Sequence, residues 1–74
     1  MNELKKLAPT RVYAINQFKG VLNMLSKEGL KVLLSETYSV PVIGLDLSRQ
    51  ELIDKILIQE YGTEDMEAFN ADNS

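Results

Sequence analysis

The chain of 74 residues contains neither cysteine nor histidine, and this absence limits how it can fold. A chain of this length buries only about 60% of the surface that its unfolded form exposes, so its stability margin is small. Small domains often compensate with disulfides or with a zinc ion held by cysteine and histidine, and this chain has the residues for neither. The core must therefore come from well-packed helices or from an oligomer interface.

The same absence excludes several classes of catalysis. Cysteine nucleophiles, serine–histidine systems, haem ligands and Cys/His zinc centres all need side chains that the sequence lacks. The remaining acid or base candidates are carboxylates on expected solvated surfaces, where no apolar enclosure prepares them for proton transfer: Asp54, Glu60, Glu64, Asp65 and Glu67. We therefore expect a non-enzymatic binding protein with no catalytic residue, cofactor or metal.

Charge and hydropathy bear on location and partners. No apolar run reaches the length of a signal peptide core or the 18 residues of a membrane span, so we expect a soluble, cytoplasmic protein. The net charge is −3, but it is unevenly distributed. Residues 1–50 contain seven Lys and Arg against four acids, whereas residues 51–74 contain one against seven. The simplest interpretation of the acidic end is a solubilising tail.

The first predicted helix covers residues 9–28. Pro9 suits a first helical turn, where its missing N–H has no partner to lose, and Gly29 is a typical helix stop. Between them, apolar residues recur at spacings of three and four, which predicts an amphipathic helix. Gly20 interrupts it and indicates either a close helix crossing or a tolerated defect.

A second, shorter helix is predicted over residues 30–36, with Leu30, Leu33 and Leu34 on its buried face. The segment that follows cannot continue this helix, because Pro41 disfavours helical geometry at Val40 and the run is rich in β-branched residues. We expect an extended connector there, with a short strand as the alternative.

The third predicted helix, residues 49–61, has the clearest local signal. Ser48 and Glu51 have the spacing of a capping box, and Gly62 supplies the stop. Thr63 can cap one further helical turn, from which Met66 and Phe69 fold back onto the core. We expect residues 1–69 to form a single all-α domain of three helices and residues 70–74 to be a disordered acidic tail. The predicted core consists of Ile15, Phe18, Leu22, Leu25, Leu33, Leu34, Leu52, Ile53, Ile56 and Leu57.

Residues 30–57 resemble the helix-extended-loop-helix superfamily, which includes SAP and HeH modules and the N-terminal domain of the Rho termination factor. The resemblance rests on LKVLL from residue 30, PVIG from residue 41 and SRQELIDKIL from residue 48. It implies a small helical module that binds DNA, RNA or a nucleic-acid-associated protein. It also implies that Lys31, Arg49 and Lys55 face phosphate. The alternative for these three residues is a role as solvated surface charges.

A second function class fits the same sequence. The chain has more apolar residues than its predicted core accommodates: Tyr13, Met24, Val42, Ile43 and Ile58. Ile58 falls off the apolar face of the third helix, so it is a candidate contact residue, or else that helix is buried on two sides. The alternative function is therefore a protein-interaction module or small inhibitor, either monomeric or homodimeric, that uses Ile58, Tyr13 and Met24 as its interface.

Overall fold

A computed structural model describes residues 7–42 and 44–72, and within these ranges the protein is all-α with no strand. The all-α class is as predicted, but four α-helices are present instead of three. A π-helical segment follows the second of them. In chain order the elements are α1 (Pro9–Asn23), α2 (Lys27–Val32), η1 (Leu33–Thr37), α3 (Arg49–Tyr61) and α4 (Thr63–Asp72). No helix of the described residues is long and apolar enough to cross a membrane.

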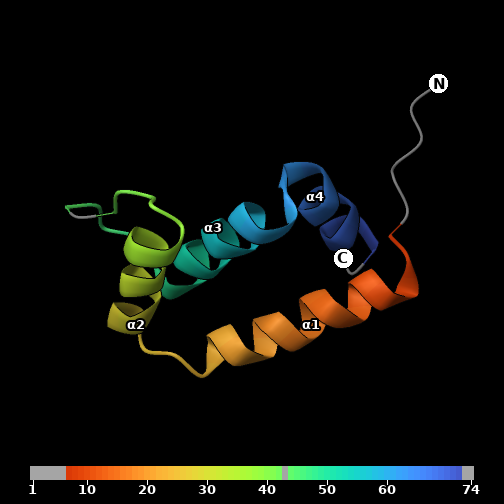
Figure 1. The fold of residues 1–74 in the computed structure, drawn as a ribbon, viewed down its shortest axis with the longest axis horizontal. Coiled ribbons are helices and arrows are strands. Elements are labelled where there is room, and N and C mark those ends of the chain that lie inside the picture. The colour runs from red at the N-terminus through yellow and green to blue at the C-terminus, as the bar shows by residue number, and fades with distance from the viewer. Residues whose placement is uncertain (1–6, 43, 73–74) are drawn as a thin grey trace.

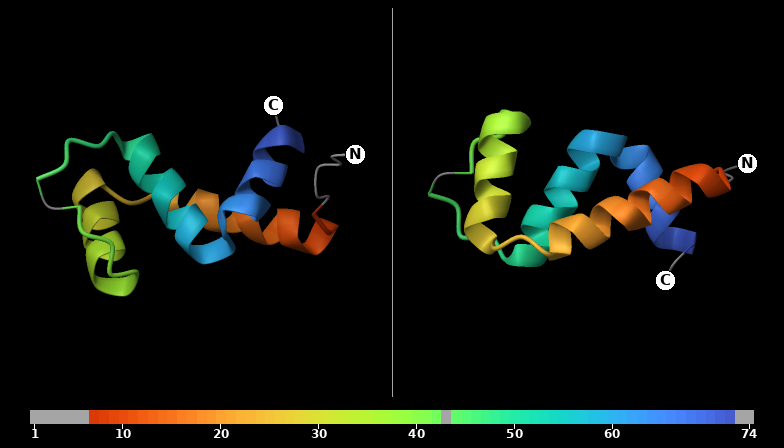
Figure 2. Two further views of the ribbon diagram at one scale, coloured as in Figure 1. Left: turned by 90° about the horizontal axis from the view of Figure 1, so that it is seen from above. Right: turned by 60° about the horizontal axis from the view of Figure 1, so that its bottom comes forward.

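The molecule is elongated, with principal extents of 41 × 25 × 21 Å. Figure 1 shows α1 running along one side, α2 at one end and α4 at the other, with α3 between them. The two further views agree with this arrangement (Figure 2). Helix α3 packs against every other helix and is therefore the central element of the fold.

Helix α1 begins as the sequence predicts. Pro9 lies in its first turn and follows the extended residue Ala8, whose carbonyl accepts from the amides of Arg11 at 2.9 Å and Val12 at 3.1 Å. A Cβ added to Gly20 would meet no atom within 4 Å, so the close-crossing interpretation of this glycine is wrong. Gly20 is exposed in the middle of the helix.

The boundary between the first two helices differs from the prediction. Helix α1 ends at Asn23, and α2 begins at Lys27 after the N-cap Ser26. The hydroxyl of Ser26 accepts from the amide of Gly29 over 3.1 Å, so Gly29 lies in the first turn of α2 and does not end α1. The capping hydrogen bond of Ser26 satisfies an amide that the start of a helix would otherwise leave without a partner.

Helix α2 passes directly into η1, and a left-handed residue lies two positions after the end of η1. Ser39 has a φ of 57°, the conformation with which helices commonly end, and the amide of Val40 donates to the carbonyl of Leu34 over 2.9 Å. The connector that follows has no strand among its described residues, as predicted, but it turns at Gly44, where the amide of Leu45 donates to the carbonyl of Val42 over 3.2 Å. Val42 is buried within it, so its assignment to a contact surface is wrong, whereas Ile43 lies outside the described residues.

Helix α3 has the predicted bounds and the predicted caps. The Ser48 hydroxyl accepts from the Glu51 amide at 3.1 Å, and the Glu51 carboxylate accepts from the Ser48 amide at 2.9 Å. The hydrogen bond from the Ser48 amide holds the pKa of Glu51 below its ordinary value. At the other end Gly62, with a φ of 94°, donates its amide to the carbonyl of Ile58 over 2.7 Å.

Helix α4 is longer than the single turn predicted. It includes residues 70–72, which the sequence assigned to the tail, while residues 73 and 74 lie outside the described part. Its buried residues Met66 and Phe69 fold back onto the core, as predicted. The ion pair of Arg11 with Asp65, at 4.0 Å, joins α4 to α1.

The core combines residues from all elements, and most were predicted. Phe18, Leu25 and Leu33, expected to be buried, are only partly so and pack against it, whereas Val42 and residues of α4 add to it. The buried cluster consists of Ile15, Leu22, Leu30, Leu34, Val42, Leu52, Ile53, Ile56, Leu57, Met66 and Phe69.

Candidate functional site

The basic residues assigned to phosphate binding make different contacts within the fold. Arg49, at the start of α3, donates from Nη2 to the carbonyl of Asn23 over 2.7 Å. Its guanidinium also donates to the carbonyl of Leu25, from Nε at 3.2 Å and from Nη2. It therefore supplies donors and a positive charge to the end of α1, whose own last turn has no basic residue.

Lys31 and Lys55 do not extend Arg49 into a basic patch. The ammonium of Lys31 lies 3.8 Å from the carboxylate of Glu28, one turn earlier in α2. Lys55 is exposed on α3, six residues after Arg49, which places the two about 120° apart around the helix axis. Of the three residues, two already have partners within the protein.

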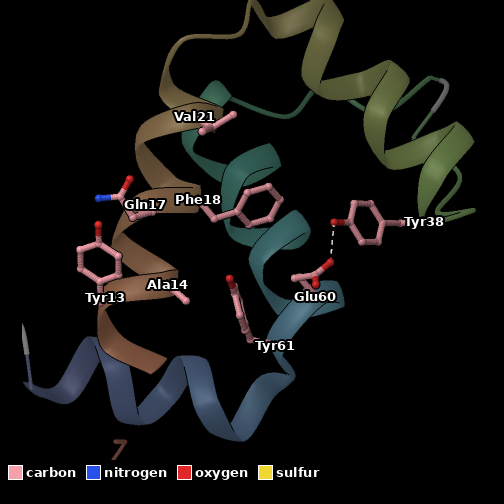
Figure 3. Close-up of a pocket in the computed structure, with 8 residues that line it drawn as sticks. All are labelled: Tyr13, Ala14, Gln17, Phe18, Val21, Tyr38, Glu60 and Tyr61. Atoms are coloured by element: carbon pink, nitrogen blue, oxygen red, sulfur yellow. Dashed lines mark hydrogen bonds between the residues drawn. The ribbon is translucent and has the colours of Figure 1, made fainter. Parts of the chain in front are cut away.

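A groove of about 550 Å³ opens between α1, the residue that follows η1 and the end of α3. Four aromatic residues contribute to its walls. In Figure 3, Phe18 of α1 and Tyr38 after η1 face one another across the groove, while Glu60 and Tyr61 of α3 extend from below. The complete lining is Tyr13, Ala14, Gln17, Phe18, Val21, Tyr38, Glu60 and Tyr61.

Two contacts fix the walls of this groove. The rings of Phe18 and Tyr61 meet edge to face, with centroids 6.3 Å apart and an interplanar angle of 73°, an arrangement that aromatic pairs favour. The hydroxyl of Tyr38 donates to Oε1 of Glu60 over 2.8 Å and thereby links the end of η1 to the last turn of α3. These contacts join side chains from three separate elements.

The hydroxyl of Tyr38 keeps its proton well beyond neutral pH. Partial burial, together with the hydrogen bond to the negatively charged Glu60, raises the pKa of Tyr38 from 10.0 to about 12. Both effects disfavour a phenolate next to a carboxylate. Tyr38 is therefore a hydrogen-bond donor to Glu60 under physiological conditions.

An exposed stripe on α1 borders the groove. Tyr13, Gln17, Val21 and Met24 follow one another at spacings of four, four and three, which place them on one side of the helix. Tyr13 is 66% exposed, Val21 54% and Met24 84%. Two residues predicted as an interface, Tyr13 and Met24, therefore lie on the same side of the helix, whereas Ile58 is 37% exposed and does not line the groove.

The groove residues Tyr38, Glu60 and Tyr61 were not predicted as a site. Helical spacing in the sequence could have revealed the stripe on α1, because its members repeat with the period of the helix. No comparable signal joins Phe18, Tyr38 and Glu60, because the fold alone brings these distant positions together.

The described residues contain no group of three or more Asp and Glu side chains placed to hold a metal ion. Comparison of the chain with protein-family models, with curated proteins and with solved structures found no match.

Proposed function

We propose that this protein is a non-enzymatic protein-interaction module that binds an amphipathic helix of a partner in the groove beside α1. The observation that carries the proposal is the open aromatic groove, continuous with the exposed stripe of Tyr13, Val21 and Met24. Aromatic residues and methionine are enriched in protein interfaces, where large side chains contribute most of the binding energy.

The dimensions of the stripe fit a helical partner. From Tyr13 in α1 to Met24, the C-cap of that helix, the stripe spans eleven positions, or about 16 Å, which corresponds to about three helical turns. An amphipathic helix presents apolar anchors at the same spacing and uses them to occupy hydrophobic grooves. The nucleic-acid function implied by the sequence resemblance has less support, because Arg49 and Lys31 already have partners within the chain.

A display library of amphipathic helical peptides provides the test. We expect peptides selected on the wild-type protein to lose at least tenfold in affinity for Val21→Glu, because a charge in the stripe cannot be buried unpaired. Val32→Glu is the matched control: Val32 lies on α2 and is 50% exposed against 54% for Val21. Circular dichroism should show both variants folded.

Two outcomes would contradict the proposal. One is a selection that yields no peptide sensitive to Val21→Glu. The other is salt-dependent binding of labelled DNA or RNA that weakens steeply between about 50 and 200 mM salt, as phosphate contacts do, and is unaffected by Val21→Glu. The second result would favour the nucleic-acid module instead.

A further inference from the structure

Glu60 occupies a position that the helix itself does not favour. It lies in the last turn of α3, where the carbonyl end of the helix is negative and a cation would be stabilising. No basic residue is present in that turn. A carboxylate at this point therefore adds negative charge to an end that is already negative.

Within residues 7–42 and 44–72, no cation neutralises this carboxylate. Its one polar contact there is the hydrogen bond from the neutral Tyr38, which occupies Oε1. The guanidinium of Arg11 lies over the ring of Tyr61, 5.5 Å from the centroid, but pairs with Asp65. Glu60 thus brings an unneutralised charge to a groove that is otherwise mainly aromatic.

The rings around Glu60 are suited to a cationic group. Aromatic faces carry negative potential and attract ammonium and guanidinium groups within about 6 Å of the centroid. Among the described residues this contact is already present, with Arg11 over Tyr61 and with the ammonium of Lys19, 5.3 Å from the ring centroid of Phe69. A partner cation in the groove would meet both aromatic surface and a carboxylate.

The hydrogen bond that Glu60 already accepts favours an ammonium over a guanidinium as its further partner. Arginine gains its advantage from two parallel hydrogen bonds to both oxygens of a carboxylate, and here Tyr38 already occupies one oxygen. An ammonium needs only the remaining oxygen, and the apolar stem of lysine can lie along the rings. We propose that the groove recognises a lysine of its partner, with the stem beside Phe18 and Tyr61 and the ammonium at Glu60.

This inference rests on the proposed function and names the chemistry of the partner, but its test needs no partner. The probe is n-butylammonium, which reproduces the end of a lysine side chain, and the matched neutral probe is n-butanol. In heteronuclear NMR titrations at constant ionic strength, we expect n-butylammonium to shift the signals of Phe18, Tyr38 and Tyr61 saturably. Its affinity should be at least fivefold higher than that of n-butanol.

Two variants assign the difference to the carboxylate. Glu60→Gln keeps the shape of the side chain and an acceptor for Tyr38, and it should remove most of the preference for n-butylammonium over n-butanol, leaving only the attraction of the rings. Glu67→Gln removes the same charge from an exposed position on α4 and should leave the preference unchanged.

The outcomes separate this inference from the proposed function. Equal affinity for the two probes, or a preference that Glu60→Gln leaves undiminished, would overturn lysine recognition even if helical peptides bind through Val21. A clear ammonium preference without any peptide that depends on Val21 would keep the cation site and overturn the helix-binding function.

Discussion

The guanidinium of Arg49, at the first position of α3, donates a hydrogen bond to the main-chain carbonyl of Asn23, at the last position of α1, over 2.7 Å. A side chain at the start of α3 therefore supplies the hydrogen-bond donor that a carbonyl at the end of α1 lacks within its own helix. Because backbone carbonyls at a helix end have no partners within the helix, this contact connects local helix formation to the tertiary arrangement.

We expect Arg49→Met to destabilise the protein by about 1 kcal/mol, since it keeps the apolar stem but removes the donors and the charge. Arg49→Lys should recover less than half of the loss, because an ammonium cannot reproduce the planar fork of donors. Urea unfolding followed by circular dichroism measures both values. Equal stability of all three proteins would show that the contact contributes nothing in solution.

Gly20 offers a stabilising change. The site of its missing Cβ is open, so Gly20→Ala introduces no clash and should raise the free energy of unfolding by about 0.5–1 kcal/mol. Gly62→Ala is the matched control: it also has open space, but its φ of 94° and ψ of 155° are nearly restricted to glycine and should make alanine cost roughly 1–3 kcal/mol. Thermal melts of the two variants should therefore move in opposite directions. Any fall in melting temperature for Gly20→Ala would contradict the expectation.

The contribution of α4 to the core can be measured at Phe69. This side chain is among the largest that are fully buried, and Phe69→Ala should cost at least 3 kcal/mol, which is a large part of the stability of a domain this small. Glu67→Ala, at an exposed position of the same helix, should change stability by less than about 0.5 kcal/mol. If Phe69→Ala unfolds in urea like the wild type, α4 is not part of the folded core in solution.

The hydrogen bond between Tyr38 and Glu60 predicts a dependence on alkaline pH. The pKa of Tyr38 is about 12 in the folded protein against 10.0 ordinarily, so the folded state binds this proton more tightly than the unfolded state. The resulting stability is complete below pH 10 and is lost as the pH rises through about 12. The free energy of unfolding of the wild type should therefore fall more steeply in this range than that of Tyr38→Phe.

The same pair can be checked by ultraviolet absorbance of the tyrosinate. Subtracting the titration of Tyr38→Phe from that of the wild type should give a single transition near pH 12. Glu60→Gln should lower the pKa of Tyr38 only partly, since burial is the larger cause and remains. A difference curve centred near pH 10 would show that the Tyr38 hydroxyl is neither buried nor hydrogen-bonded to Glu60 in solution.

What the sequence predicted well depends on contacts between near neighbours. The start of α3 follows from the capping box of Ser48 and Glu51, which are three positions apart. Its end follows from Gly62, whose amide donates to a carbonyl four positions earlier. The end of α1 was misplaced because Gly29 was taken as a stop, although Ser26 three residues earlier begins the next helix. A glycine alone does not show which side of a helix boundary it occupies.

The candidate site was harder to predict, because its contacts join distant positions. Tyr38 and Glu60 are 22 residues apart, and Arg49 reaches carbonyls 24 and 26 residues earlier in the chain. Main-chain carbonyls carry no signature in the sequence, so the internal role of Arg49 could not be distinguished from an available surface charge. The exposed stripe of α1 was partly found, since Tyr13 and Met24 were among the predicted contact residues.

Two isoleucines of α3, Ile56 and Ile58, lie on different sides of the helix. Ile56 is fully buried, whereas Ile58 is 37% exposed. Ile56→Glu should unfold the protein, because it would bury an unpaired charge in the core. Ile58→Glu should retain nearly all helical content, since its new carboxylate can reach water.

The association of these variants tests whether Ile58 is an interface residue. A side chain of this size can gain on the order of 2 kcal/mol when a partner removes it from water completely, and less here because Ile58 is already partly covered. If Ile58 lies in an interface, Ile58→Glu should weaken self-association in analytical ultracentrifugation or partner binding while the monomer remains folded. Because Ile58 does not line the groove, Val21→Glu should not reproduce its effect on self-association. Unfolding of Ile58→Glu to the same extent as Ile56→Glu would instead assign Ile58 to the monomer core and remove it from the interface.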